Sequence, residues 1–595
     1  MKHVSPDQWA YVIVPFLVYG GLVAALSVLG WESSLRANLH RNYLVIFFKT
    51  ISAGLERATG YPGWAMAGAL SGLWSLGTAV VGLYWDVAWH IDLGRDKQLF
   101  TPPHTMIVIG LAGIVYSACI AVLFATLDDA PVGVRVPGLH IPYSAIPMAA
   151  LGVGALVSFP LDALWHAAYG LDVTLWSPTH LMLVGGGGLA TIPTWLMLVE
   201  GRPAGRTTLL GRGIVALALG AILVAVSCFE GEFDFGVPQF QVLYLPVLIA
   251  AAAAFTLVVA RAALGPWGAI KAVVAYLIVR GAVALIVWGP LHHTFPRFPL
   301  YLASAVVVEA VAAWVGTDNR LRYALASGVA IATVGVAGEL AWVKLSGWGE
   351  LPANDARVFL VVPAAALSAA VLGGALSRPV LGRPVLGRPT GSRRAVPAMA
   401  AGMAGVVLAG TLLALLPRNV GEVNATIRLI PAGQQATVAV ELAPADAARR
   451  ATAFGVVAWQ GGGRVSAKLN EVGPGRYISS RPLPVTGDWK TMVGLQRGDE
   501  VMAAPVYLPA DPEINASAFP ALPERRAAFV RNTDLLLREQ HAGPAWPSVV
   551  GYSGLAVMVA FWTGLMAFAA HRLSGAGTEP LVLAQPAVHA GASDP

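Results

Sequence analysis

Two segments of this chain place one aspartate and two histidines at the same spacing. Residues 86–106 read DVAWHIDLGRDKQLFTPPHTM, and residues 162–182 read DALWHAAYGLDVTLWSPTHLM. A shift of 76 residues without a gap aligns nine identical positions, which in the first copy are Asp86, Trp89, His90, Gly94, Asp96, Leu99, Pro102, His104 and Met106. Two imidazoles and a carboxylate form a ligand set that suits copper, zinc or non-haem iron.

The spacing predicts how each copy brings its ligands together. Asp86 and His90 are four residues apart, so on a helix they share one face. Pro102 is expected to keep a helix from running through the next segment, and His104 then begins a returning helix. Each copy is therefore predicted to be a hairpin with a metal site, and the ligands of the second site are Asp162, His166 and His180. The alternative is that each Asp–His pair only braces a duplicated hairpin, which leaves the second histidine of each copy unexplained.

Two further aspartates recur in the turns of these hairpins. Asp96 and Asp172 occupy equivalent positions, between the first and second histidines of each copy. Carboxylates near metal-bound histidines accept their second N–H and fix the tautomer. We therefore expect Asp96 and Asp172 to orient the ligands.

The elements that carry these residues are predicted to be membrane helices. The chain is 56% apolar and 12% charged, with a mean hydropathy of +0.65, whereas a soluble protein has roughly 25% charged residues. Apolar runs of about 20 residues can cross a bilayer. About thirteen such runs lie near 10–31, 64–89, 104–126, 144–168, 180–199, 209–229, 240–261, 268–289, 299–316, 321–343, 357–376, 397–416 and 547–571.

Composition also excludes several classes of function. The 39 basic residues exceed the 33 acidic ones, which gives a net charge of +6, but they form no basic stripe, so nucleic acid is not an expected partner. The two cysteines, Cys119 and Cys228, lie in separate apolar runs. A disulfide framework and a CxxC metal site are therefore excluded.

The basic loops predict the orientation in a cell inner (cytoplasmic) membrane. Short loops rich in Lys and Arg follow odd-numbered spans, and such loops stay cytoplasmic. The N-terminus and both histidine hairpin turns are then outside, whereas the C-terminus is cytoplasmic. The stretch 35–58 mixes apolar and basic residues and is expected along the inner interface.

One region is predicted to be a soluble β domain. Between 420 and 512, seven short alternating runs are separated by Gly, Pro and Asp, which is typical of an immunoglobulin-like β-sandwich. It contains no His or Cys, so it cannot be a copper-binding cupredoxin, and we expect it to dock a partner or to shield the membrane part from outside.

The sequence predicts six regions along the chain. They are 1–60, the first helix and interfacial segment; 61–200, the metal hairpins; 201–418, further spans; 419–515, the external sandwich; 516–575, the linker and last span; and 576–595, a disordered tail.

Within residues 60–190, the chain resembles the membrane subunit that holds a copper site in the copper membrane monooxygenases, the family of particulate methane and ammonia monooxygenase. The first helical hairpin of that family carries a D-x-x-W-H…R-D…F-T-P-x-H pattern. This chain matches it with Asp86, Trp89, His90, Arg95, Asp96, Phe100, Thr101, Pro102 and His104. The second family hairpin is matched by Asp162, His166 and His180, although Asp162 stands where the family has an amide.

The resemblance implies a function for these residues. It implies that Asp86, His90 and His104 are catalytic ligands of copper, where O2 is activated, and that Arg95 and Asp96 orient ligands or move protons. A small apolar substrate would arrive through the lipid, and electrons would come from an external donor such as a quinol. Further monooxygenase subunits or a second copy of the chain are expected partners. The alternatives are a non-catalytic protein that binds or transfers copper and docks a periplasmic partner, and a structural membrane protein.

Other polar residues are predicted at the same outer face. They are Glu230, Glu232, Asp234, His292, His293 and Glu339. Such residues either are solvated loop charges, line a path for cations or protons, or add metal ligands. Arg280 and Glu309 lie at similar predicted depth, and we expect them to form an ion pair.

Overall fold

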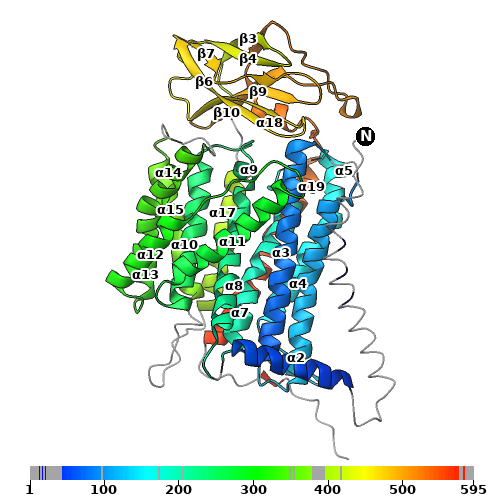
Figure 1. Ribbon diagram of the computed structural model, residues 1–595, viewed down its shortest axis with the longest axis vertical. Helices are drawn as coiled ribbons and strands as arrows, with labels where there is room; N and C mark the ends of the chain where they lie inside the picture. Colours follow the sequence, from blue (N-terminus) through cyan, green and yellow to red (C-terminus); the bar gives the residue numbers. More distant parts are fainter. Residues whose placement is uncertain are drawn as a thin grey trace, which may run out of the picture.

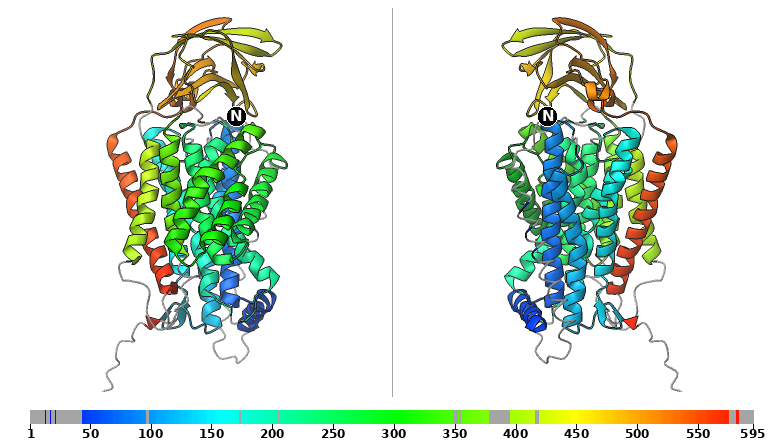
Figure 2. Two further views of the ribbon diagram at one scale, coloured as in Figure 1. Left: turned by 90° about the vertical axis from the view of Figure 1, so that its left-hand side faces the viewer. Right: turned by 90° about the vertical axis from the view of Figure 1, so that its right-hand side faces the viewer.

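The chain folds into a bundle of long helices with a separate β-rich domain at one end (Figure 1). We call this end the domain end. The computed structural model describes residues 43–574 except 96–97, 172–173, 204, 238, 348–351, 353–354, 378–394 and 416–418, together with 13, 17, 21 and 581–582. Helix α2 (Tyr43–Thr59), which covers most of the predicted interfacial stretch, lies across the end of the bundle opposite the β domain (Figures 1 and 2).

Among the residues that the structure describes, ten helical segments are long and apolar enough to cross a membrane, which indicates a membrane protein. The remaining bundle helices in chain order are α3 (Gly63–Asp92), α4 (Pro102–Leu127), α5 (Ala145–Tyr169), α6 (Pro178–Leu189), α7 (Thr191–Glu200), α8 (Leu209–Ser227), α9 (Gly231–Asp234), α10 (Tyr244–Leu264), α11 (Gly268–Trp288), α12 (Leu302–Val315), α13 (Arg320–Ala330), α14 (Val336–Ser346), α15 (Val358–Leu376), α17 (Ala395–Leu415) and α19 (Ala545–Ser574). Three of the ten segments join successive helices, namely α6 with α7, α8 with α9, and α13 with α14.

The ten segments fall on ten of the predicted spans. The run predicted at 299–316 forms the shorter helix α12, and the run at 397–416 forms α17. The predicted first span, 10–31, and the tail, 576–595, lie outside the described residues except for isolated positions.

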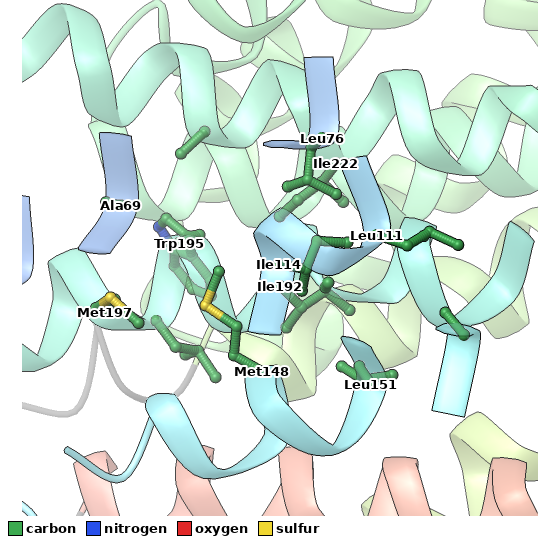
Figure 3. Close-up of a cluster of buried hydrophobic side chains, with 14 of the residues drawn as sticks. Ala69, Leu76, Leu111, Ile114, Met148, Leu151, Ile192, Trp195, Met197 and Ile222 are labelled. Atoms are coloured by element: carbon green, nitrogen blue, oxygen red, sulfur yellow. The ribbon is translucent and has the colours of Figure 1, made fainter. Parts of the chain in front are cut away.

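Helices α3 and α4 pack closely because glycines line their contact. A Cβ added at Gly110 would lie 2.6 Å from the backbone nitrogen of Ala79, and one at Gly82 would lie 2.8 Å from that of Ile107. Small residues let membrane helices approach in this way. Large side chains from these two helices and from α5, α7 and α8 interlock in one apolar core (Figure 3). They include Leu76, Leu111, Ile114, Met148, Leu151, Ile192, Trp195 and Ile222.

The β domain is one continuous, barrel-like antiparallel sheet. Its strands are β3 (Asn424–Ala432), β4 (Gln435–Ala443), β5 (Ala453–Trp459), β6 (Val465–Gly473), β7 (Arg476–Ser479), β8 (Leu483–Pro484), β9 (Lys490–Arg497), β10 (Glu500–Tyr507), β11 (Glu524–Ala528) and β12 (Val530–Arg531). They run in the order β11-β3-β4-β7-β6-β5-β9-β10-β12, with β8 beside β4. Each of the seven predicted runs forms a strand. Two further strands and the short helix α18 (Asn532–Leu536) extend the domain past residue 515.

A buried ion pair joins helices α9 and α11. Arg280 donates to the Asp234 carboxylate at 2.7 Å, and neither side chain is exposed. Tyr84 of α3 donates to the same carboxylate at 2.9 Å. The predicted pair of Arg280 with Glu309 is therefore wrong. Glu309 instead accepts from Arg261 at 2.7 Å, because the depth of a residue along its helix does not determine which neighbour that helix faces.

Removing Arg280 should destabilise the bundle strongly. Loss of one partner of a buried pair leaves an uncompensated charge, which costs about 3–5 kcal/mol. We expect Arg280→Met to lower the melting temperature of the purified protein in detergent, whereas Arg428→Met, which breaks an exposed pair with Glu524, should change it little. Equal effects of the two substitutions would contradict a stabilising role for the buried pair.

Candidate metal centre

Both predicted ligand sets converge at the domain end of the bundle. In the first triad, the Asp86 Oδ1 atom lies 3.1 Å from His104 Nε2 and 3.7 Å from His90 Nε2. In the second triad, the Asp162 Oδ2 atom lies 3.3 Å from His180 Nε2 and 3.5 Å from His166 Nε2. Within each triad, one ligand atom of every residue lies within 4.8 Å of the others, as the binding of one metal ion requires.

The hydrogen bonds of the histidines indicate which ring nitrogen faces the metal position. His104 Nδ1 lies 2.8 Å from the Leu99 carbonyl oxygen, and His180 Nδ1 lies 2.6 Å from that of Thr174. A carbonyl can only accept, so Nδ1 carries the hydrogen, and in a neutral imidazole the Nε2 lone pair then faces the carboxylate. Backbone carbonyls commonly orient metal-binding histidines in this way. These residues therefore fit a bound cation.

The repeated Thr/Ser-Pro-x-His sequence positions the second histidine of each triad. Thr101 is the N-cap of α4, and its side chain accepts from the backbone N–H of His104, while Pro102 begins the helix. Ser177 does the same for His180 in α6. Proline suits the first helical position because its missing N–H needs no partner there. The predicted break at Pro102 is thus a helix start, which places the histidine on the first turn.

The glycine shared by the two copies turns the chain between the triad helices. Gly94 and Gly170 both adopt positive φ, at 96° and 82°. Non-glycine residues rarely adopt this conformation. The two aspartates expected nearby, Asp96 and Asp172, lie outside the described residues.

The two triads differ at one hydrogen bond. Thr179 donates to Asp162 Oδ1 at 2.6 Å, which leaves Oδ2 facing the histidines. The position equivalent to Thr179 in the first copy is Pro103, which has no donor to offer Asp86. The two carboxylates therefore have different freedom to rotate or to bind a metal through both oxygens.

All six ligands line one cavity of about 560 Å³, which we call the chamber. The sequence predicted two sites at one membrane face, and the fold places both on the lining of the same cavity. The β domain contributes to its wall, with Trp459, Gln460, Glu513, Leu536 and Leu537. No sequence pattern points to these residues, because they lie more than 270 positions from the nearest ligand and carry no metal-binding motif.

A smaller cavity adjoins the chamber on the side of the helix bundle. It has a volume of about 180 Å³ and a lining of mostly apolar side chains. Four residues line both cavities, namely Leu83, Ile107, Leu183 and Val184. The apolar cavity therefore lies directly against the space that the ligands face.

Arg95 connects the first hairpin to the β domain. Its guanidinium bonds to both oxygens of Asp511 and to Glu513 at 2.6 Å, and it lies 3.6 Å from Glu539. These acidic partners raise the pKa of Arg95, and Arg95 lowers the pKa of the Asp511 carboxyl. Arg95 also lines the chamber, but its carboxylate partners belong to the β domain and its linker.

The other polar residues predicted at this face are mostly buried. Glu230, Asp234 and Glu339 are at most 2% exposed and lie away from the chamber lining, whereas Glu232 lines the chamber. His293, which is 6% exposed, lies 3.0 Å from the Asp92 carboxylate. These side chains are therefore buried rather than solvated loop charges, while His292 is exposed.

Comparisons with known proteins identify no relative. No family model, no curated protein and no solved structure matches the chain.

The contact of Arg95 with Asp511 predicts a pH-dependent stability. Because the pKa of Asp511 is lowered in the folded protein, this contact stabilises the fold above the ordinary aspartate pKa of about 3.9. The stabilisation is lost as the pH falls through the lowered value. Arg95→Gln should thus lower the melting temperature at pH ~7, and the difference from wild type should shrink below pH ~4.

A matched variant separates this pair from general effects of losing an arginine. Arg525 donates to the backbone carbonyl of Pro520, so Arg525→Gln removes an arginine bonded to a group that does not titrate. Its effect on melting temperature should not change across the same pH range. A pH-independent effect of Arg95→Gln would contradict the assignment.

Proposed function

We propose that this chain is a copper-dependent membrane monooxygenase-like protein, or a subunit of one, that oxidises a small apolar substrate of the methane, ammonia or alkane class with O2. The observation that carries the proposal is the chamber, into which two Asp-His-His triads face and against which an apolar cavity lies. The motif resemblance to the copper membrane monooxygenases supports copper over iron or zinc. Copper, when bound, supplies the one-electron redox chemistry that O2 activation requires.

The chain's own residues would hold and shield the metal. Asp86, His90 and His104 would bind it in the first site, and the equivalent second triad would bind another ion. The three side chains of the first triad are 16–20% exposed, so each ligand is partly accessible from the chamber. Residues of the β domain on the chamber wall would limit entry of bulk water, which protects reactive intermediates.

The apolar cavity supports the proposed class of substrate. Its lining would favour O2 or a short hydrocarbon over a polar molecule, because apolar surfaces gain free energy when they leave water. Such a molecule dissolves in lipid and can approach from the membrane. Electrons would come from an external donor such as a quinol, and additional subunits or a second copy would complete the assembly.

Several finer features remain predictions. They are the count of about thirteen spans, the immunoglobulin-like form of the β domain, and the placement of that domain outside an inner membrane. The position of α2 at the opposite end from the β domain supports this orientation, because a helix bearing basic residues belongs on the cytoplasmic face.

Metal binding tests the two triads directly. We expect His90→Ala and His166→Ala each to lose about one of two copper equivalents in metal analysis, because each removes one of the three ligands that a site offers. His140→Ala is the control, since His140 also faces an aspartate, Asp129 at 3.5 Å, but belongs to neither triad. Full copper retention by His90→Ala would rule out the first site as assigned.

Oxygen consumption distinguishes catalysis from copper handling. With a quinol and a short hydrocarbon, wild-type protein should consume O2 and His90→Ala should lose more than ~99% of that rate, since without the metal the barrier rises by several kcal/mol. Copper bound without O2 consumption under any reductant would instead support the alternative, a copper-binding or copper-transfer protein. The partly exposed ligands would suit either role.

A further inference from the structure

The β domain caps the C-terminal end of helix α3 by donating hydrogen bonds to its last carbonyls. The last four carbonyls of a helix have no partners within the helix and must find donors elsewhere. In α3, the Trp89 carbonyl accepts from Leu93 at 2.8 Å. The next three accept from a turn of the β domain. Gln460 N–H donates to Ile91 at 2.9 Å, Gly462 N–H donates to Asp92 at 2.9 Å, and the Gln460 side-chain amide donates to His90 at 3.2 Å.

The turn that provides these donors has an unusual residue at its centre. Gln460 has a φ of 64°, in the left-handed region, where residues other than glycine are uncommon. Three glycines, at 461–463, follow it directly. A glycine at 460 would adopt this φ without strain but would lack the amide that reaches His90. Trp459, which is 2% exposed, anchors the turn.

The same glutamine also lies against the group that orients the His90 ring. His90 Nδ1 lies 3.2 Å from the Gly94 carbonyl oxygen. A Cβ added at Gly94 would come within 3.4 Å of the Gln460 side chain. Gln460 therefore bonds to the backbone of a metal ligand and lies close to Gly94, whose carbonyl faces the imidazole of that ligand.

We propose that Gln460 is a positioning residue for the first metal site, and that docking of the β domain sets the geometry of that site through the end of α3. The proposal rests on the metal-binding part of the proposed function and does not require catalysis. Groups around a metal ligand tune its affinity about 10–100-fold, and here that group comes from another domain, 370 residues away along the chain.

The second triad serves as a comparison because the carbonyls at the end of its helix, α5, accept hydrogen bonds from a different segment of the chain. In α5, the His166 carbonyl accepts from Gly170 at 2.9 Å, and the Tyr169 carbonyl accepts from His541 at 2.9 Å. The donors are thus the local turn and the linker after the β domain. A change at Gln460 should leave this helix end intact.

The experiment measures Cu(II) binding and EPR spectra of the full-length protein in detergent. Gln460→Ala is combined with His166→Ala, so that only the first triad binds copper, and separately with His90→Ala, so that only the second does. We expect about 10-fold weaker copper binding and altered hyperfine values in the first background, and no change in the second. Gln460→Gly should weaken binding equally, which separates the lost amide from relief of backbone strain.

A second docking glutamine provides the matched control. Gln496 donates to the Phe240 carbonyl at 3.1 Å and accepts from Val242 N–H at 3.0 Å, so it joins the β domain to the bundle away from α3. Gln496→Ala should leave both copper spectra unchanged. Equal changes from Gln460→Ala and Gln496→Ala, or equal changes at both triads, would overturn the proposal in favour of general loosening of the domain.

The outcomes separate this inference from the proposed function. Copper that binds without O2 consumption would contradict the monooxygenase proposal and leave the positioning test in force. An unchanged first-site spectrum in Gln460→Ala would contradict positioning by Gln460 and leave the monooxygenase proposal standing. A wild-type protein that binds no copper at the first triad would overturn both. Hydrogen exchange of the metal-free protein adds a check, because slow exchange of the Gln460 and Gly462 amides is expected only if they cap α3.

Discussion

Polar groups at a membrane-helix end need partners, and this requirement governs the domain end of the bundle. An unpaired polar group away from water costs free energy comparable to a lost hydrogen bond. Here the Nδ1 atoms of His90, His104 and His180 lie within hydrogen-bond distance of backbone carbonyls. The Asp162 carboxylate accepts from Thr179, and the last carbonyls of α3 accept from the β domain. The histidine Nε2 atoms lie 3.1–3.7 Å from one carboxylate oxygen of their own triad and beside the chamber, which is a set of atoms that a metal ion could bind.

The β domain is therefore part of the site rather than an appendage. It caps α3, it pairs with Arg95, and it lines the chamber. A soluble domain at the end of a membrane bundle could be tethered loosely, but this one contacts the two hairpins that carry the ligands. Arg95 and the α3 cap involve the first hairpin, and the linker after the domain reaches the end of α5.

The helices beyond residue 200 support the site from the side. Helices α8 and α11 line the apolar cavity together with α3, α4 and α6. The buried pair of Arg280 and Asp234 bonds to Tyr84, two residues before the ligand Asp86. A charge pair in such surroundings is a weak source of net stability, but it is costly to break. It can therefore hold α3 in one rotation about its axis, which is the rotation that directs Asp86 and His90 into the chamber.

The sequence by itself determined the local parts of this protein. Of the spans that hydropathy predicted, ten form helices that can cross a membrane in the part of the chain that the structure describes. Alternation located seven strands, and the duplicated spacing located both triads, because each of these patterns depends on residues near one another in the chain. Only the tertiary structure decided that the triads share one chamber and that Arg280 pairs with Asp234 instead of Glu309. It also decided that Gln460, 370 residues from His90, caps the end of α3. Such contacts depend on how helices rotate and which domain docks where, and no short-range periodicity encodes either.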